Sequence, residues 1–207
     1  MARPRKGPSV ILEEFERLEA FRLERVGTGG LGTGDIERLV HMHRDAFPTF
    51  PYDFENKLDL MLANPSTYLM ALVRSRRNRR IYSFSNLELN NISLDDDSVL
   101  RLAEYDNTMR ATRCPDLGEV GGLGAVLRVA LAREAAKRRV DLCHAESRTG
   151  LTAINAISYH SGMRYGGTLE NHLLISGEND IPYDMPSRFQ SMNVWYLNGP
   201  ALKSWYG

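Results

Sequence analysis

Three strand patterns follow one another in the middle of the chain, with no helix pattern between them. Apolar residues in alternating or continuous runs predict strands over residues 67–75 ("TYLMALVRS"), 80–89 ("RIYSFSNLEL") and 101–112 ("RLAEYDNTMRAT"). A long helix pattern over residues 122–138 and a strand pattern over residues 140–147 come next. Three strands in a row exclude a simple alternating βαβ array. They favour a mixed α/β sheet in which antiparallel hairpins adjoin one βαβ crossover.

The flanking segments predict the remaining elements. Apolar residues at helical spacing predict helices over residues 9–20, 34–47, 54–64 and 152–162. Asp35 stands where it could cap the second of these helices. Strand patterns cover residues 21–26, 164–175 and 191–198. After the N-terminal helix, the predicted order is therefore β-α-α-β-β-β-α-β-α-β-β, with no internal repeat.

Composition narrows the class of protein. The 207 residues carry 26 basic and 26 acidic side chains, so no net charge attracts the chain to nucleic acid or to a membrane. No apolar run approaches the length of a bilayer span, and the first residues lack the features of a signal peptide. Two cysteines argue against a disulfide framework. We therefore expect a cytoplasmic protein with a helical extension over residues 1–20 and a single domain over residues 21–207.

Two glycine clusters raise the question of a phosphate-binding loop. The first, "VGTGGLGTGD" (residues 26–35), has the G-x-G-x-x-G spacing, but the strand before it is too charged for the centre of a parallel sheet. We interpret it as a turn. The second contains Gly121, Gly122 and Gly124 and opens the helix of residues 122–138. Backbone N–H groups at such a helix start suit an anion such as a pyrophosphate, although a close-packed helix entry is the alternative.

Several motifs together resemble the GNAT superfamily of N-acyltransferases, and within it the β-lysine N-acetyltransferase-like branch. They are "FPTFPYDF" (47–54), "AEYDNTMRAT" (103–112), "INAISYHSGMRYGGTLENHLLISG" (154–177) and "QSMNVWY" (190–196). The resemblance implies a splayed mixed sheet of about seven strands flanked by about four helices, to which this chain adds an N-terminal helix. It also implies an acyl thioester whose pantetheine arm lies between the fourth and fifth strands, and direct acyl transfer to an amine.

The resemblance also implies roles for single residues. Glu104 matches the branch's glutamate and is the predicted base or holder of a cationic amine. Asp106, two residues on and on the same strand face, is a weaker candidate. Asn155 is predicted to hydrogen-bond the pantetheine arm. Gly121, Gly122, Gly124 and Ala125 are predicted to receive the pyrophosphate. For each carboxylate, a solvated strand face is the alternative interpretation.

Two positions depart from the superfamily's pattern. Glu119 stands where Arg or Gln is usual, and its carboxylate would repel a pyrophosphate by about 1 kcal/mol or more. The tyrosine that often protonates the leaving thiolate aligns with Ser158, and Tyr159 is its neighbour, so both are candidates for the general acid. The first departure leaves two donors open, acyl-CoA and a phosphopantetheine thioester on an acyl-carrier protein.

An acidic carrier protein would need a basic docking surface. The predicted turn "RSRRNRR" offers Arg74, Arg76, Arg77, Arg79 and Arg80, although such charge runs are usually solvated. Two other classes remain as alternatives, a catalytically silent GNAT-like binding module and a nucleic-acid-binding domain. The balanced charge counts against the second. We expect no metal site, because His41 and His43 lie on different faces of their helix.

Overall fold

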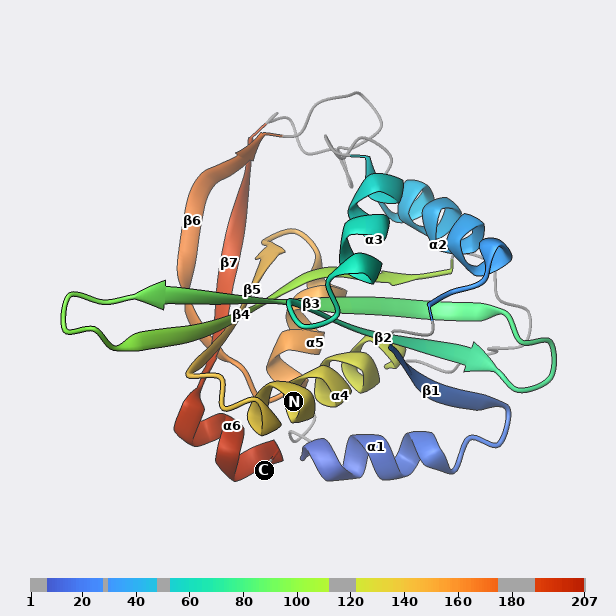
Figure 1. Cartoon of the computed structure of the whole chain (residues 1–207), viewed down its shortest axis with the longest axis horizontal. Coiled ribbons are helices and arrows are strands. Elements are labelled where there is room, and N and C mark those ends of the chain that lie inside the picture. Colours follow the sequence, from blue (N-terminus) through green and yellow to red (C-terminus); the bar gives the residue numbers. More distant parts are fainter. Residues whose placement is uncertain (1–6, 28–29, 48–52, 112–121, 175–188, 207) are drawn as a thin grey trace.

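The computed structural model describes residues 7–27, 30–47, 53–111, 122–174 and 189–206. One sheet of seven strands runs through the molecule in the order β1-β2-β3-β4-β5-β7-β6 (Figure 1). The strands are β1 (Phe21–Val26), β2 (Tyr68–Ser75), β3 (Ile81–Ser93), β4 (Val99–Arg110), β5 (Leu142–Arg148), β6 (Arg164–Leu174) and β7 (Phe189–Asn198). The predicted α/β class is confirmed, as is the predicted order of strands along the chain.

The described residues form six helices on the two faces of this sheet (Figure 1). They are α1 (Pro8–Glu16), α2 (Thr33–Ala46), α3 (Phe54–Ala63), α4 (Leu123–Lys137), α5 (Thr152–His160) and α6 (Gly199–Tyr206). Helices α2 and α3 cover one face, and α1, α4 and α6 lie on the other (Figure 1). Five of the six match the predicted helices. None of the helices in the described part of the chain is long and apolar enough to cross a membrane.

Helix α6 was not predicted from the sequence. Its eight residues bury Leu202 and Tyr206, and it packs mainly against α4. The Tyr206 hydroxyl donates a hydrogen bond to the backbone oxygen of Ser161, just after α5. The two buried side chains fall four residues apart, which is one helical turn, but a segment this short gives too few repeats for the period to be recognised.

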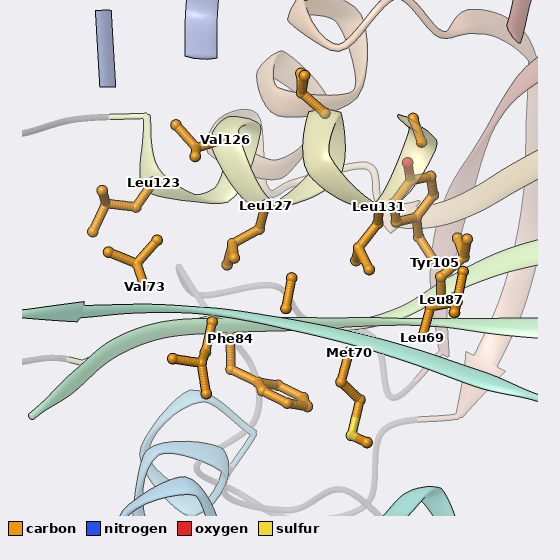
Figure 2. Close-up of a cluster of buried hydrophobic side chains, with 14 of the residues drawn as sticks. Leu69, Met70, Val73, Phe84, Leu87, Tyr105, Leu123, Val126, Leu127 and Leu131 are labelled. Carbon is orange, nitrogen blue, oxygen red and sulfur yellow. The ribbon is translucent and has the colours of Figure 1, made fainter. Parts of the chain in front are cut away.

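The core lies between the sheet and its two helical layers. Leu127 and Leu131 of α4 point at the sheet, where Val73 of β2 points back toward them (Figure 2). Met70 of β2 and Phe84 of β3 point to the opposite face of the sheet, toward α2 and α3 (Figure 2). Burying one such side chain stabilises the fold by roughly 2 kcal/mol. Strand β2 is buried along its whole length because both of its faces are covered.

One ion pair corrects a prediction at the start of α2. The residue before the helix is Gly32, and no side chain caps it. Asp35 instead receives two hydrogen bonds from the guanidinium of Arg74, both at 2.8 Å. Arg74 is only 8% exposed and also donates to Glu24 at 3.0 Å. Asp35 therefore ties α2 to β2, because breaking a buried ion pair would leave the guanidinium of Arg74 without a counter-charge.

The parallel pair β4–β5 is short. Only Leu102–Tyr105 of β4 face Leu142–Ala145 of β5, whereas the other neighbouring strands pair antiparallel. Both strands continue beyond Tyr105 and Ala145, but in the described residues they do not pair with each other there. The sheet therefore opens between β4 and β5, as the predicted splay requires.

A bulge in β4 coincides with the end of this pairing. Leu87 faces Tyr105 and Ser85 faces Thr108, so two residues of β4, Asp106 and Asn107, face Asn86 alone. The extra residue reverses the alternation of side chains along the rest of the strand. It also lets consecutive side chains, those of Asp106 and Asn107, reach the α2–α3 face.

We expect Gly162→Ala to lower the free energy of unfolding by about 1–2 kcal/mol. Gly162 joins α5 to β6 with a φ of +89°, and an added Cβ would lie 3.1 Å from Cε3 of Trp205 in α6. Urea denaturation measures the change. Gly34→Ala in α2 is the matched control, because nothing lies within 4 Å of its added Cβ and alanine favours a helix. An equal loss in both variants would contradict this reasoning.

Candidate active site

Glu104 and Asp106 lie where β4 and β5 separate. Glu104 pairs with Glu88 of β3 on one side and with His144 of β5 on the other. Its side chain is 42% exposed, and that of Asp106 is 25% exposed. The structure places both carboxylates on the sheet face that α2 and α3 cover. Their catalytic role stays a prediction.

Helix α3 contributes a lysine that the sequence did not single out. The ammonium of Lys57 lies 3.3 Å from Oε2 of Glu88 and 3.5 Å from Oδ2 of Asp106. It also stands 5.5 Å from the centre of the Tyr68 ring. Burial lowers the pKa of Lys57, but the carboxylates of Asp106 and Glu88 outweigh it and raise that pKa overall. Lys57 is therefore a fixed cation that binds two carboxylates.

Strands β5 and β6 add two histidines and another carboxylate. Nε2 of His144 lies 3.9 Å from Oε2 of Glu104, and Nε2 of His172 lies 3.4 Å from Oε2 of Glu146. The sequence predicted no role in the site for His144. The available signal was the alternation along residues 142–148, which puts His144 and Glu146 on one strand face. We call Glu88, Glu104, Asp106 and Glu146 the acidic cluster.

The surroundings change the proton affinity of both predicted carboxylates. Burial raises the pKa of Glu104, and the other three members of the acidic cluster raise it further, while His144 opposes them. Burial also raises the pKa of Asp106, against the effect of Lys57 and of a hydrogen bond from Asn86. Among the described residues, Glu104 has no cation as close to it as Lys57 is to Asp106. It is therefore the carboxylate better suited to accept a proton.

A network of amides fixes the bulge. The backbone N–H and the side-chain amide of Asn107 both donate to Oδ1 of Asn86, at 3.1 Å and 3.2 Å. The same amide donates to Oδ2 of Asp106 at 2.9 Å. Asn107 also hydrogen-bonds His43 of α2, whose ring stacks on Phe54 with centres 4.2 Å apart. The carboxylate of Asp106 is therefore held by Asn107 of β4, Asn86 of β3 and Lys57 of α3.

The start of α4 holds the predicted donor-binding residues. Gly122 precedes the helix with a φ of +86°, and Gly124 lies in its first turn. A Cβ on Gly124 would lie 2.7 Å from Cδ1 of Ile157, so this glycine lets α5 approach α4. Ala125 is buried. Gly121 and Glu119 lie outside the described residues, and binding of a pyrophosphate here stays a prediction.

Asn155 connects α5 to the end of β5 and to β7. Its amide donates to the backbone oxygens of Arg148 and Leu151, at 2.8 Å and 2.9 Å. Its oxygen accepts from Nδ2 of Asn193 at 3.0 Å and from Nε1 of Trp195 at 2.9 Å. All four hydrogen-bonding positions are occupied within the chain. A pantetheine arm that binds here would have to replace one of these partners.

The two candidates for the general acid lie in different environments. Ser158 is fully buried, and its hydroxyl accepts a hydrogen bond of 2.6 Å from Arg128 of α4. Tyr159 is 44% exposed, and its ring contacts that of His160. Of these two residues, only Ser158 lies between α4 and α5.

Solved structures that match this chain include N-acetyltransferases. Arabidopsis thaliana NAA60 in complex with acetyl-CoA matches with a TM-score of 0.65 and 12% identity, over 86% of this chain and 98% of that one. A variant of the Vibrio cholerae SpeG spermidine N-acetyltransferase matches with a TM-score of 0.61 and 13% identity, over 88% and 96%. The Escherichia coli ribosomal-protein-S18-alanine N-acetyltransferase matches with a TM-score of 0.56 and 20% identity, over 86% and 93%. Neither the protein-family models nor the curated proteins contain a match.

The chain has the GNAT fold. The likeness extends over most of this chain and over most of each matched protein. At identities of 20% or less, it is a likeness of fold. The resemblance to the β-lysine N-acetyltransferase-like branch stays a prediction.

The structure changes the predicted basic docking surface on this GNAT fold. Arg74 does not belong to it, because its guanidinium is buried against Asp35 and Glu24. Arg76 donates to the backbone oxygen of Phe21 at 3.0 Å. Arg77, Arg79 and Arg80 remain exposed in the turn between β2 and β3. The described residues contain no group of three or more His, Cys, Asp or Glu side chains arranged to hold a metal ion.

Burial of His43 makes the stability of the protein depend on pH. Its pKa is lowered to about 4, mainly by burial and partly offset by the hydrogen bond with Asn107. A histidine that stays neutral in the folded state loses its stabilising contribution as pH falls from its unfolded pKa toward its folded one. The loss here is up to about 3 kcal/mol between about pH 6.5 and pH 4.

We therefore expect His43→Phe to weaken the acid sensitivity of urea unfolding in that pH range. The phenyl ring preserves stacking on Phe54 but binds no proton. His41→Phe is the control, because His41 is exposed on the same helix and its loss should leave the pH dependence as in the wild type. Identical pH dependence in all three proteins would show that His43 is not the group that titrates.

Proposed function

We propose that this protein is an N-acyltransferase that moves an acyl group from a pantetheine thioester to the amine of a small cationic molecule. The observation that carries the proposal is the end of the β4–β5 pairing at Tyr105 and Ala145, with Glu104 beside it. The opening gives an extended thioester arm a place between two strands. Glu104 stands on the face from which an amine would approach.

The proposed reaction needs a base, because an ammonium group cannot attack a carbonyl carbon. Glu104 takes a proton from the ammonium. The free amine then attacks the thioester carbon and forms a tetrahedral intermediate. The nitrogen of this intermediate loses its second proton to water, and the carbon–sulfur bond breaks with its electron pair on sulfur. Backbone N–H groups of β4 beyond Tyr105 are available to stabilise the tetrahedral oxyanion, because β5 no longer pairs with this part of the strand.

The acidic cluster supports a cationic acceptor. Four carboxylates face one lysine and two histidines in this part of the described structure, so the local charge is negative when the histidines are neutral. Diamines, polyamines and basic amino acids place a second positive charge a few bonds from the reacting amine. The spermidine N-acetyltransferase among the similar structures acts on an acceptor of this kind.

For the donor, we propose acyl-CoA first. NAA60, which shares this fold, was solved in complex with acetyl-CoA. The start of α4 presents backbone N–H groups beside Gly122. A carrier-bound thioester remains the second donor, because Glu119 departs from the usual pattern and Arg77, Arg79 and Arg80 are exposed.

Calorimetric titration with acetyl-CoA, followed by release of free thiol with spermidine, lysine and an N-terminal alanine peptide, tests this proposal. We expect micromolar binding and faster turnover with the first two acceptors. Binding without turnover of any amine would favour a silent GNAT-like binding module. Turnover from an acylated carrier protein alone, lost on charge reversal of Arg77, Arg79 and Arg80, would favour the carrier as donor.

We expect Glu104→Gln to reduce kcat/KM at neutral pH by about 100-fold or more, the usual contribution of a general base. In the wild type, kcat/KM should fall as pH decreases through the raised pKa of Glu104, because only the carboxylate accepts a proton. The variant should lack this acid limb. Glu37→Gln, on an exposed position of α2, is the control and should retain it. An acid limb that persists in Glu104→Gln would assign the base to another residue.

A further inference from the structure

Arg128 is a fully buried guanidinium without a carboxylate partner in the described residues. Only 1% of it is exposed. Its Nη1 donates to Oγ of Ser158 at 2.6 Å and contacts Sδ of Met163 at 3.6 Å, while its buried Nε has no hydrogen-bond partner. Burying a charge without a counter-charge is costly, and apolar residues of similar volume usually pack as well or better. An anion present only during function would explain why this position holds a charge.

The guanidinium lies beside the opening between β4 and β5. It stands 4.9 Å from the centre of the Tyr105 ring, and Tyr105 is the last residue of β4 that pairs with β5. The Tyr105 hydroxyl donates to the backbone oxygen of Arg128 at 2.7 Å. Ile157, next to Ser158, packs near Thr108 of β4 just beyond the opening. Arg128 and Ser158 therefore lie on the α4 side of the opening, opposite the acidic cluster.

We propose that Arg128 stabilises the thiolate that leaves during acyl transfer, acting through Ser158. This inference rests on the proposed function. When the carbon–sulfur bond breaks, its electron pair remains on sulfur, and the Ser158 O–H donates a hydrogen bond to that sulfur. Arg128 donates to the serine oxygen and so strengthens the hydroxyl as a donor. Glu104 takes the first proton that the amine nitrogen loses, and water takes the second as the tetrahedral intermediate collapses. The thiolate takes a proton from water after it leaves.

Ser158 has a hydroxyl proton that can serve this role. In the structure the hydroxyl donates to the backbone oxygen of Ile154 at 3.2 Å, a long bond for an O–H donor. Rotation of the hydroxyl about the Cβ–Oγ bond turns its proton away from the Ile154 oxygen. The hydrogen bond from Arg128 to Oγ is kept. Burial lowers the pKa of Arg128 to about 10, so the guanidinium remains charged at neutral pH and acts as a fixed cation. Arg128 is thus a positioning and polarising residue, and Ser158 contacts the sulfur.

The test compares two donors with leaving groups of different stability. Acetyl-CoA releases an alkyl thiolate, which needs stabilisation, whereas the acetyl thioester of an aryl thiol releases a thiolate that is already stable. We expect Arg128→Met to lower kcat/KM about 100-fold with acetyl-CoA and no more than about 5-fold with the aryl thioester. Ser158→Ala should show the same selectivity. Arg17→Met, at the exposed end of α1, is the control with unchanged rates.

Equal losses with both donors would assign Arg128 a structural role and overturn the inference, while the proposed function would stand. A wild type that transfers acyl groups from neither donor would overturn both. A further measurement needs no variant. The affinity of the wild type for CoA should rise with pH around and above neutral as its thiol ionises, whereas that for desulfo-CoA should not. Parallel pH profiles for these two ligands would also overturn the inference.

Discussion

The rest of the site depends on how soon the parallel pairing of β4 and β5 ends. Parallel strands need a crossover, and here α4 supplies it while its apolar side packs on β2, β3 and β4. The pairing covers four residues on each strand, and β5 then pairs only with β7. Beyond that point the backbone of β4 is not paired with β5. Consecutive side chains at the end of the pairing point to opposite faces of the sheet. Glu104 belongs to one face and Tyr105 to the other.

The two faces differ in charge. On the α2–α3 face, Lys57 pairs with two of the four carboxylates of the acidic cluster, and burial together with their mutual repulsion makes Glu104 a stronger base. On the α4 face, one guanidinium is buried between Tyr105 and Ser158. In acyl transfer, positive charge is lost from the amine and negative charge develops on sulfur. In the proposed reaction, the sheet would thus place a negative field where the cation arrives and a positive field where the anion forms.

Periodicity alone predicted five helices, seven strands and their order, because each of these elements carries its own pattern of apolar residues. It also placed Glu104 and Asp106 on one face. Lys57 and Glu88 could not be found in this way, because each reaches the site from a different element and nothing in its local sequence marks it. The burial of Arg74 could not be predicted for the same reason, because in the sequence it is one of several arginines in a predicted turn. Its burial follows from Asp35, 39 residues away.

Arg128 shows this limit most clearly, because a charged residue in a helix is normally assigned to the solvent face. Helix α4 is covered by the sheet, α1, α5 and α6, so it has little solvent-facing surface at that position. The tertiary arrangement overrides the residue's usual preference. The serine that receives its hydrogen bond was visible in the sequence only as a substitution for a tyrosine.

The bulge at Asp106 and Asn107 divides β4 into two segments with separate registers. The segment before it carries Glu104, which belongs to the acceptor side, and the segment after it carries Thr108, which borders α4 and α5. The extra residue and its amide network hold the backbone between these two segments. Substitution of side chains in the first segment should therefore leave the backbone of the second in place. In the proposed acyltransferase, this arrangement would let the acceptor side change while the thioester side is kept.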